Sequence, residues 1–447
     1  MYWRCQHSKC QVILKTDSNF FVLNHDSISN HDHDTIPDSD IIKGELRQSL
    51  KRKAAKQPNG RPSKLVCDET ENVDEEIFFD TDYFNFTKAM YRAVRKGRPP
   101  LPRCLEDVNE VLKMAQEEPS FKGSVLVQYV SKDIVMFASE HSFKLMSSKD
   151  CTLLADGTFK FCPKFYKQLY TLHQYVAGVY TPTAFFLLKN KRFHTYRNML
   201  NIIKMKLNVS NLDFDVQTFI VDFERSMLKA IADVLPGCKI RGCNFHLAQA
   251  WMKKIQRLGM STLYQNKRSV TGKWLRHLFG FRMMKWELVP QAFEDYAKLA
   301  PRGLAKFLDY LRRTWMTEQS KFPPKLWAGA AQSNVPNTTN ACESFHLHFG
   351  KLFNSPHPNI YVFLENLHDW AKLARWKARR SKPVIVKKPA SIILDAFLFE
   401  VKHISVSTFL SRMATRLDPP RLLRSTRRRR AQAAKKPMWA LRERNRS

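Results

Sequence analysis

Three carboxylates with the character of metal ligands lie far apart in the chain, at Asp156, Asp222 and Glu343. Carboxylate oxygens are hard ligands that suit Mg²⁺ and Mn²⁺. Two such cations, held about 3.5–4 Å apart, can stabilise both the attacking and the leaving oxygen when a phosphodiester is cleaved. A single aspartate in a turn or at a strand end is more often structural. The chemistry therefore depends on whether the fold brings the three side chains together.

The segments around these carboxylates predict alternating strands and helices. Three apolar, aromatic and β-branched runs separated by turn signals are typical of consecutive strands. Helical spacing and buried strands then alternate in the order β-β-β-α-β-α-β, followed by more helices. The segments in that order are 151–162, 166–176, 180–190, 193–207, 218–224, 225–235 and 239–246.

This order indicates an α/β protein, and an antiparallel meander followed by β-α-β units is similar to the ribonuclease-H-like mixed sheet. In that fold the first strand lies beside the fourth in the centre of the sheet. Asp156 lies in the first predicted strand and Asp222 lies at the end of the fourth. We therefore expect these two carboxylates to face one another.

Glu343 is the best candidate for a third acid, in the helical stretch TTNACESFHLHFGKLF. Asn337 or Thr338 can cap this helix, which places Glu343 near its second turn. His346 and His348 could supplement Glu343, but positions on the exposed side of a helix explain them equally well.

A second candidate metal site lies at the N-terminus, where Cys5, Cys10, His31 and His33 have the spacing C-x4-C-x20-H-x-H. Two thiolates and two imidazoles are a tetrahedral zinc set. Alternating apolar and polar residues around them predict short strands, and a segment this small needs a metal to hold its fold. The alternative is a coincidence in a stretch rich in His and Asp, and His25 is a rival ligand.

The chain of 447 residues is strongly basic, with 74 Lys and Arg against 41 Asp and Glu and a net charge of +33. An imbalance of this size indicates a polyanionic partner. No window reaches the roughly 20 apolar residues of a membrane helix, and the nine scattered cysteines indicate reduced thiols. We therefore expect a soluble, intracellular protein that binds nucleic acid and no membrane.

The excess charge is concentrated in four stretches, 43–64, 253–285, 372–388 and 421–447. The long segment between His246 and Glu343 contains tryptophans at helical spacing, which predicts an inserted helical domain. Its basic residues are interleaved with Trp274 and Phe281, which are either core residues beneath a solvated face or part of a DNA surface. The candidate DNA contacts are Lys253, Lys254, Arg257, Lys273, Arg276, Lys372, Arg375 and Arg379, the last three at positions i, i+3 and i+7 of one helix.

Four pieces of sequence, taken together and in order, resemble the Mutator-like element (MULE) transposase domain. They are ADGTF at 155–159, IVDFE at 220–224, GCNFHLAQA at 242–250 and TTNACESFH at 338–346. The resemblance implies that Asp156, Asp222 and Glu343 form a catalytic, metal-binding DDE triad. It also implies that Cys243 and His246 form a C-x2-H motif, which could bind zinc, position DNA or simply pack where a strand meets its helix.

The residues YWRC, the second cysteine and the terminal H-x-H resemble the FLYWCH zinc finger. This is a small all-β module associated with DNA or protein binding. Members of the family have about another hairpin before YWRC, so we expect a partial module stabilised by Zn²⁺.

The MULE resemblance implies a nuclear DNA transposase that binds terminal inverted repeats. It implies strand cleavage by water and 3′-hydroxyl strand transfer into target DNA, with Mg²⁺ or Mn²⁺ as cofactor. The partners would be transposon ends, target DNA and further copies of the chain in a homo-oligomer, with no small-molecule substrate. The alternative is a domesticated, non-catalytic DNA-binding chromatin or transcription factor, and a ribonuclease-H-like nuclease acting on RNA shares the metal chemistry.

These segments give an expected domain order. Pro, Gly and Asn interrupt the basic stretch 43–64, which favours a flexible linker. The acidic segment 68–82 that follows can fold back on its basic neighbours. The expected parts are a zinc finger over 1–40, a basic then acidic linker over 41–82, a mainly helical region over 83–145, a catalytic core over 146–250 and 336–380, a helical insertion over 251–335, and a basic, partly disordered C-terminal extension over 381–447.

Overall fold

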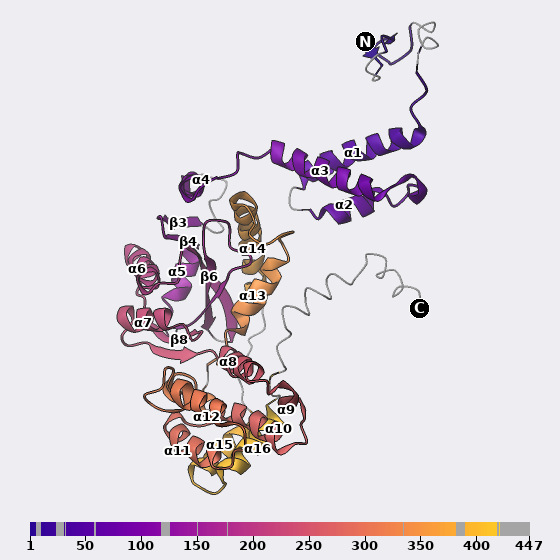
Figure 1. The fold of residues 1–447 in the computed structure, drawn as a ribbon. Coiled ribbons are helices and arrows are strands. Elements are labelled where there is room, and N and C mark those ends of the chain that lie inside the picture. The colour runs from indigo at the N-terminus through magenta and orange to yellow at the C-terminus, as the bar shows by residue number, and fades with distance from the viewer. Residues whose placement is uncertain are drawn as a thin grey trace. The chain divides into compact units, whose positions relative to one another are not determined.

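The computed structural model describes residues 1–5, 10–23, 31, 33–57, 60–117, 126–149, 151–176, 178–333, 335–380, 389–417 and 420. The chain separates into two compact units, Met1–Leu101 and Pro102–Ser447 (Figure 1). In the described part of the chain, every helix is too short or too polar to cross a lipid bilayer.

The first unit contains a small β-ribbon and three helices. Strands β1 (Tyr2–Arg4) and β2 (Ile13–Lys15) pair antiparallel. The helices are α1 (Asp38–Lys56), α2 (Pro62–Glu69) and α3 (Asp80–Lys96). Their shared apolar core consists of Leu46, Leu50, Ala54, Leu65, Phe86 and Met90.

The prediction of a flexible linker over the basic stretch 43–64 is wrong, because this stretch supplies Leu46, Leu50 and Ala54 of the helical core of the first unit. Leu46, Leu50 and Ala54 recur every four residues and form the buried side of α1, while the basic residues lie between them. Pro62 is the first residue of α2, where the missing N–H of proline costs nothing. The high charge of the segment concealed this apolar spacing.

The acidic segment 68–82 does fold back on this basic stretch. Lys43 Nζ lies 3.0 Å from Asp82 Oδ2, and Lys53 forms an ion pair with Glu69. Opposite charges from separate helices thus lie side by side in the first unit.

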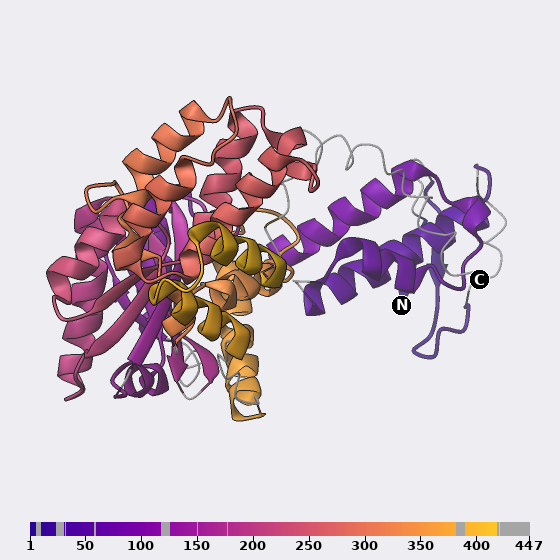
Figure 2. The same ribbon diagram turned by 90° about the horizontal axis from the view of Figure 1, so that it is seen from below.

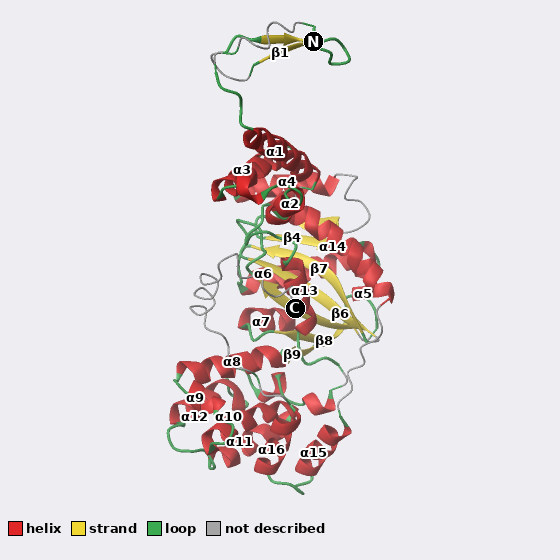
Figure 3. Cartoon of the chain, turned by 90° about the vertical axis from the view of Figure 1, so that its right-hand side faces the viewer, coloured by secondary structure: helices red, strands yellow, loops and turns green. Residues whose placement is uncertain are grey.

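The second unit is built on a seven-stranded mixed sheet with the strand order β3-β4-β7-β6-β5-β8-β9 (Figure 3). Neighbours from β3 to β5 in this order pair antiparallel, and β5, β8 and β9 pair in parallel. The strands are β3 (Leu126–Val130), β4 (Ile134–Ala138), β5 (Cys151–Thr158), β6 (Gln168–Val176), β7 (Val179–Leu188), β8 (Val216–Val221) and β9 (Lys239–Gly242).

The predicted contact between the first and fourth strands is confirmed, since β5 pairs with β8 through Leu153 with Phe219 and Leu154 with Ile220. The region 83–145, predicted to be mainly helical, also supplies β3 and β4. Every residue of β4 is buried, and a short run without polar alternation cannot be distinguished from a helix core by its pattern.

Helices cover both faces of the sheet (Figure 1). One face packs against α5 (Glu140–Met146), α6 (Phe193–Val209) and α7 (Arg225–Val234) through a core that includes Met136 and Phe186. The other face packs against α4 (Leu105–Glu117), α13 (Asn340–Gly350) and α14 (Ile360–Arg380) through Phe137 and Phe185. Successive residues of a strand point to opposite faces, so β4 and β7 contribute to both cores.

The helical insertion has its own apolar core, which residues of the C-terminal segment complete. Its helices are α8 (Asn244–Arg257), α9 (Ser261–Gln265), α10 (Val270–His277), α11 (Val289–Ala297) and α12 (Ala305–Leu311). Figure 2 shows α15 (Ala390–Glu400) and α16 (Val406–Arg416), in yellow, beside these helices.

The extension predicted over 381–447 therefore differs from the structure, because its apolar residues Ile392, Phe409 and Met413 join the core of the insertion. Gly280 allows α16 to approach closely, since a Cβ atom there would lie 2.9 Å from Cβ of Met413. The basic tail 421–447 lies outside the described residues.

Candidate active site and metal centres

Asp156 and Asp222 occupy equivalent places on two neighbouring parallel strands. The last paired residues of β5 and β8 are Leu154 and Ile220, and each aspartate lies two residues further along its chain. Residues two apart share a face, and neighbouring strands lie about 4.8 Å apart. Burial raises the pKa of Asp222 to about 6, and the negative charges of Glu224 and Asp156 add to this shift.

Helix α13 brings Glu343 to the same site. Its N-cap is Thr339, one residue beyond the predicted Thr338, so Glu343 lies in the first turn and not the second. Burial raises the pKa of Glu343 to about 7, an effect that His246 opposes and Asp156 increases. Among the described residues, no hydrogen-bond donor reaches its buried Oε1 atom. This oxygen is a buried acceptor without compensation.

His246, in the first turn of α8, also lies in the site. Its Nε2 atom is 3.8 Å from Glu343 Oε1, which is too long for a hydrogen bond. One ligand atom each from Asp156, His246 and Glu343 lies within 4.8 Å of the others, while Asp222 is outside this group of described residues. Burial lowers the pKa of His246, but the Cys243 sulfur and the charges of Asp156 and Asp222 outweigh it and raise the pKa to about 9.

Cys243 is fully buried at the N-cap of α8, and its contacts explain why two helices converge. Its sulfur accepts hydrogen bonds from the backbone N–H of Thr339 (3.2 Å) and from the Thr339 hydroxyl (3.3 Å). The backbone N–H of Asn244 donates to the carbonyl of Asn337 at 2.8 Å. Of the alternatives left open for the C-x2-H motif, Cys243 packs at the strand–helix junction, whereas His246 lies beside the carboxylates.

Asp156 has a further neighbour in His346, one turn after Glu343 on α13. The buried His346 places Nδ1 3.5 Å from Asp156 Oδ2, and its Nε2 lies 3.0 Å from the hydroxyl oxygen of Thr171. This hydroxyl donates to the backbone carbonyl of Asp156 at 3.4 Å. His346 therefore supports Asp156 and not Glu343. Its spacing of i, i+3 from Glu343 could have predicted that both side chains lie on the same face of the helix.

The donor atoms fit a divalent cation. An octahedral cation with metal–oxygen distances near 2.1 Å places neighbouring donors about 3 Å apart and opposite donors about 4.2 Å apart. The separation of 3.8 Å between His246 and Glu343 lies between these two values. A cation would also compensate the buried Oε1 atom of Glu343, which has no donor in the described part of the chain.

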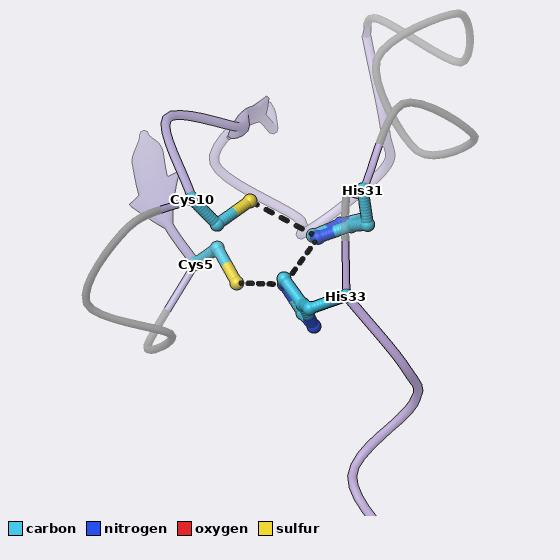
Figure 4. A group of neighbouring side chains, drawn as sticks. All are labelled: Cys5, Cys10, His31 and His33. Carbon is cyan, nitrogen blue, oxygen red and sulfur yellow. Dashed lines mark hydrogen bonds between the residues drawn. The ribbon is translucent and has the colours of Figure 1, made fainter.

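The N-terminal cysteines and histidines converge as well (Figure 4). Cys5 Sγ lies 3.2 Å from His33 Nε2, Cys10 Sγ lies 3.3 Å from His31 Nδ1, and these two nitrogens are 3.1 Å apart. A tetrahedral zinc ion bound at about 2.0–2.3 Å places its ligand atoms about 3.3–3.8 Å apart, slightly more than these separations. The four residues thus fit a zinc ion. The rival ligand His25 lies outside the described residues.

The predicted DNA contacts in the insertion lie on its surface or at its edge. Lys253, Arg257 and Lys273 are exposed. Lys254 and Arg276 are half-buried, and each places its charge 4.9 Å from the centre of a tyrosine ring. Aromatic rings therefore hold the charges of Lys254 and Arg276, whereas the other three side chains are exposed to solvent.

The aromatic residues of this stretch are core residues. Trp274 and Phe281 are buried in the apolar core of the insertion, so they do not form a DNA surface. Lys372, Arg375 and Arg379 belong to α14, but their side chains lie outside the described residues.

Comparison with known families found a match that covers part of this site. The family model of the MULE transposase domain matches residues 152–250. The matched segment runs from β5 into α8 and includes Asp156, Asp222, Cys243 and His246, while Glu343 lies beyond it. The match supports a transposase-type function, which implies DNA binding and the use of divalent cations. A search of curated proteins found no match to the chain.

Proposed function

We propose that the protein is a DDE-type DNA transposase whose catalytic residues are Asp156, Asp222 and Glu343. One observation supports the proposal: Asp156 and Asp222 follow the last paired residues of β5 and β8 by two residues, and ligand atoms of Asp156 and Glu343 lie within 4.8 Å of each other. The MULE match begins in β5. The strand order β7-β6-β5-β8-β9, antiparallel and then parallel, supports a ribonuclease-H-like core. The reaction is strand cleavage at terminal inverted repeats and transfer of the 3′-hydroxyl end into target DNA.

The three carboxylates would hold Mg²⁺ or Mn²⁺, which supplies charge to the attacking and leaving oxygens of phosphoryl transfer. The chain's own task is to hold these side chains in place. His346 and Thr171 fix Asp156 from one side. No side chain acts as a covalent nucleophile in this proposal.

The remaining parts of the proposal concern binding. The exposed Lys253, Arg257 and Lys273 would contact DNA phosphates, since a stretch with nine basic residues and no acid favours a polyanion. The N-terminal group would hold Zn²⁺ in a FLYWCH-type finger. We further propose that the protein acts in the nucleus as a homo-oligomer on paired transposon ends.

The test is cleavage of duplex DNA that carries the inverted repeats flanking the gene, with Mg²⁺ or Mn²⁺ supplied. Wild-type protein should cut at the repeat end and join it to a second duplex, and Asp156→Asn should do neither. Asp213→Asn, at an exposed aspartate, is the matched control and should retain activity. Equal cutting by Asp156→Asn would contradict the proposal, and repeat binding without any cutting by wild type would favour the non-catalytic alternative.

A further inference from the structure

His246 lies in the site, but a triad of three carboxylates gives it no role. The tightest group of ligand atoms consists of Asp156, His246 and Glu343, and not of the three acids. This set contains two oxygen donors and one imidazole nitrogen. Its chemistry therefore differs from that of an all-carboxylate centre.

No hydrogen bond joins His246 to Glu343, whose separation is that of an ion pair. His246 Nε2 is 3.8 Å from Glu343 Oε1, beyond hydrogen-bond distance. Among the described residues, no group donates a hydrogen bond to Glu343 Oε1, although a buried oxygen is normally hydrogen-bonded. Both side chains remain about a quarter exposed, at 24% and 27%, although the Oε1 atom of Glu343 is itself buried. Ligand atoms of Asp156, His246 and Glu343 lie within 4.8 Å of one another, so one cation can contact all three.

The backbone fixes His246 in this position. The sulfur of Cys243 accepts hydrogen bonds from Thr339. The backbone N–H of Cys243 donates to the carbonyl of Val221 at 2.7 Å. His246 follows Cys243 by three residues, and Glu343 follows Thr339 by four, so each lies about one helical turn from the joined pair. The separation of the imidazole from the carboxylate is thus set by the junction of α8 with α13.

We infer that His246 Nε2 is a ligand of the divalent cation held by Asp156 and Glu343, and that this nitrogen makes the site select Mn²⁺ over Mg²⁺. The inference rests on the proposed function, because it concerns the same cation. Mg²⁺ prefers oxygen ligands in near-ideal octahedral geometry and gives up water reluctantly. First-row transition metals accept imidazole nitrogen together with carboxylate oxygen. A site with this mixed donor set therefore discriminates between the two ions.

Electron spin echo envelope modulation of Mn²⁺ bound to the full chain tests this directly, because it detects ¹⁴N nuclei bonded to the metal. The N-terminal Cys/His group is loaded with Zn²⁺ first. Wild type should show ¹⁴N coupling, and excess Mg²⁺ should displace the Mn²⁺ only weakly. His246→Ala should lose the coupling and bind Mn²⁺ about tenfold more weakly, a loss typical of damage to a metal's ligand environment. His348→Ala, at an exposed histidine of α13, is the control and should match wild type.

The outcomes separate this inference from the proposed function. Bound Mn²⁺ without ¹⁴N coupling in wild type, or coupling that survives in His246→Ala, overturns the role of His246 but leaves the carboxylate site standing. Absence of any Mn²⁺ binding by wild type overturns both. If His246→Ala does not fold, His246→Gln replaces the imidazole with another polar side chain. In addition, wild type labelled with ¹⁵N-histidine must show ¹⁵N coupling in place of the ¹⁴N coupling.

Discussion

The sulfur of Cys243 accepts two hydrogen bonds from Thr339, one from the backbone N–H at 3.2 Å and one from the hydroxyl at 3.3 Å. These residues are the N-caps of α8 and α13. The contact joins the two helices that carry His246 and Glu343. The two residues of the C-x2-H motif thus have different roles. Cys243 positions the helices, and His246 lies beside the carboxylates.

Removing the Thr339 hydroxyl should weaken this junction. Thr339→Val should lower the free energy of unfolding by about 1 kcal/mol, the net value of one buried hydrogen bond, and should lower cleavage activity further by misplacing Glu343. Urea unfolding and the cleavage assay measure the two effects. Thr338→Val is the control at the neighbouring residue, and Cys243→Ser should retain more activity than Cys243→Ala because its hydroxyl can still accept the hydrogen bonds. Equal activity of these two cysteine variants would contradict the positioning role.

The metal-free protein should respond to pH through Glu343. Burial raises its pKa to about 7 in the folded chain, above the ordinary value of 4.5. An acid with a raised folded pKa destabilises the folded state when it is ionised, and this cost grows as pH rises from about 4.5 through 7. In EDTA, Glu343→Gln should therefore increase the melting temperature at pH 8 and change it little at pH 4. A lower melting temperature of the variant at pH 8 would show that the ionised carboxylate has a partner.

Mn²⁺ should stabilise the second unit. Binding to the folded state alone adds about 2.7 kcal/mol at a free concentration of about 100 Kd. Thermal unfolding should show this gain in wild type, and the gain should disappear in Asp156→Asn and remain in Asp213→Asn. An equal gain in Asp156→Asn would place the Mn²⁺ at another site.

The N-terminal group should bind one Zn²⁺ per chain without supporting the second unit. Cys10→Ser should remove the metal, because it deletes one of the four converging ligands. Cys67→Ser, at an exposed cysteine, should keep it. Metal analysis of the purified variants counts the zinc. Thermal unfolding of the second unit should be the same in both variants, since it belongs to a separate compact unit.

Exposed basic residues of α8 should contribute to DNA affinity through counterion release. Removal of one side chain that neutralises a phosphate reduces the slope of log K against log salt by about 0.9. The double variant Lys253→Ala with Arg257→Ala should thus lower the slope by about 1.8, and Lys298→Ala, just after α11, should leave it unchanged. A slope in the double variant equal to that of wild type would exclude these residues from the DNA interface.

Much of the sheet and two of its carboxylates could be predicted from local patterns. The segments that carry Asp156 and Asp222 are apolar runs bounded by turn signals. The pairing of β5 with β8 was expected because the order of elements resembles the ribonuclease-H-like sheet. The junction of α8 with α13 could not be predicted in this way. It depends on a contact between Cys243 and Thr339, which are far apart in the chain. Local sequence patterns relate only residues that are close together in the sequence.

The errors in the predicted domain organisation have a different cause. Those predictions were based on the number of charged residues, and the spacing of the apolar residues was overlooked. In 41–82 the many basic and acidic residues concealed Leu46 and Leu50 on one side of α1. In the C-terminal segment the arginines near the end concealed Phe409, which completes the core of the insertion. Charge describes the solvent side of a helix, whereas a few apolar residues decide where it packs.

The proposed triad is tested most directly by Asp222, the one of its members outside the tight group of donor atoms. The measurement is the rate of strand cleavage at a terminal-repeat end by wild type and by Asp222→Asn, each with Mn²⁺ and each in EDTA. We predict cleavage by wild type only with Mn²⁺, and a rate at least about 100-fold lower for Asp222→Asn, as expected for loss of a group that acts in the transition state. Cleavage by Asp222→Asn at the wild-type rate would contradict the assignment of this site as a DDE centre.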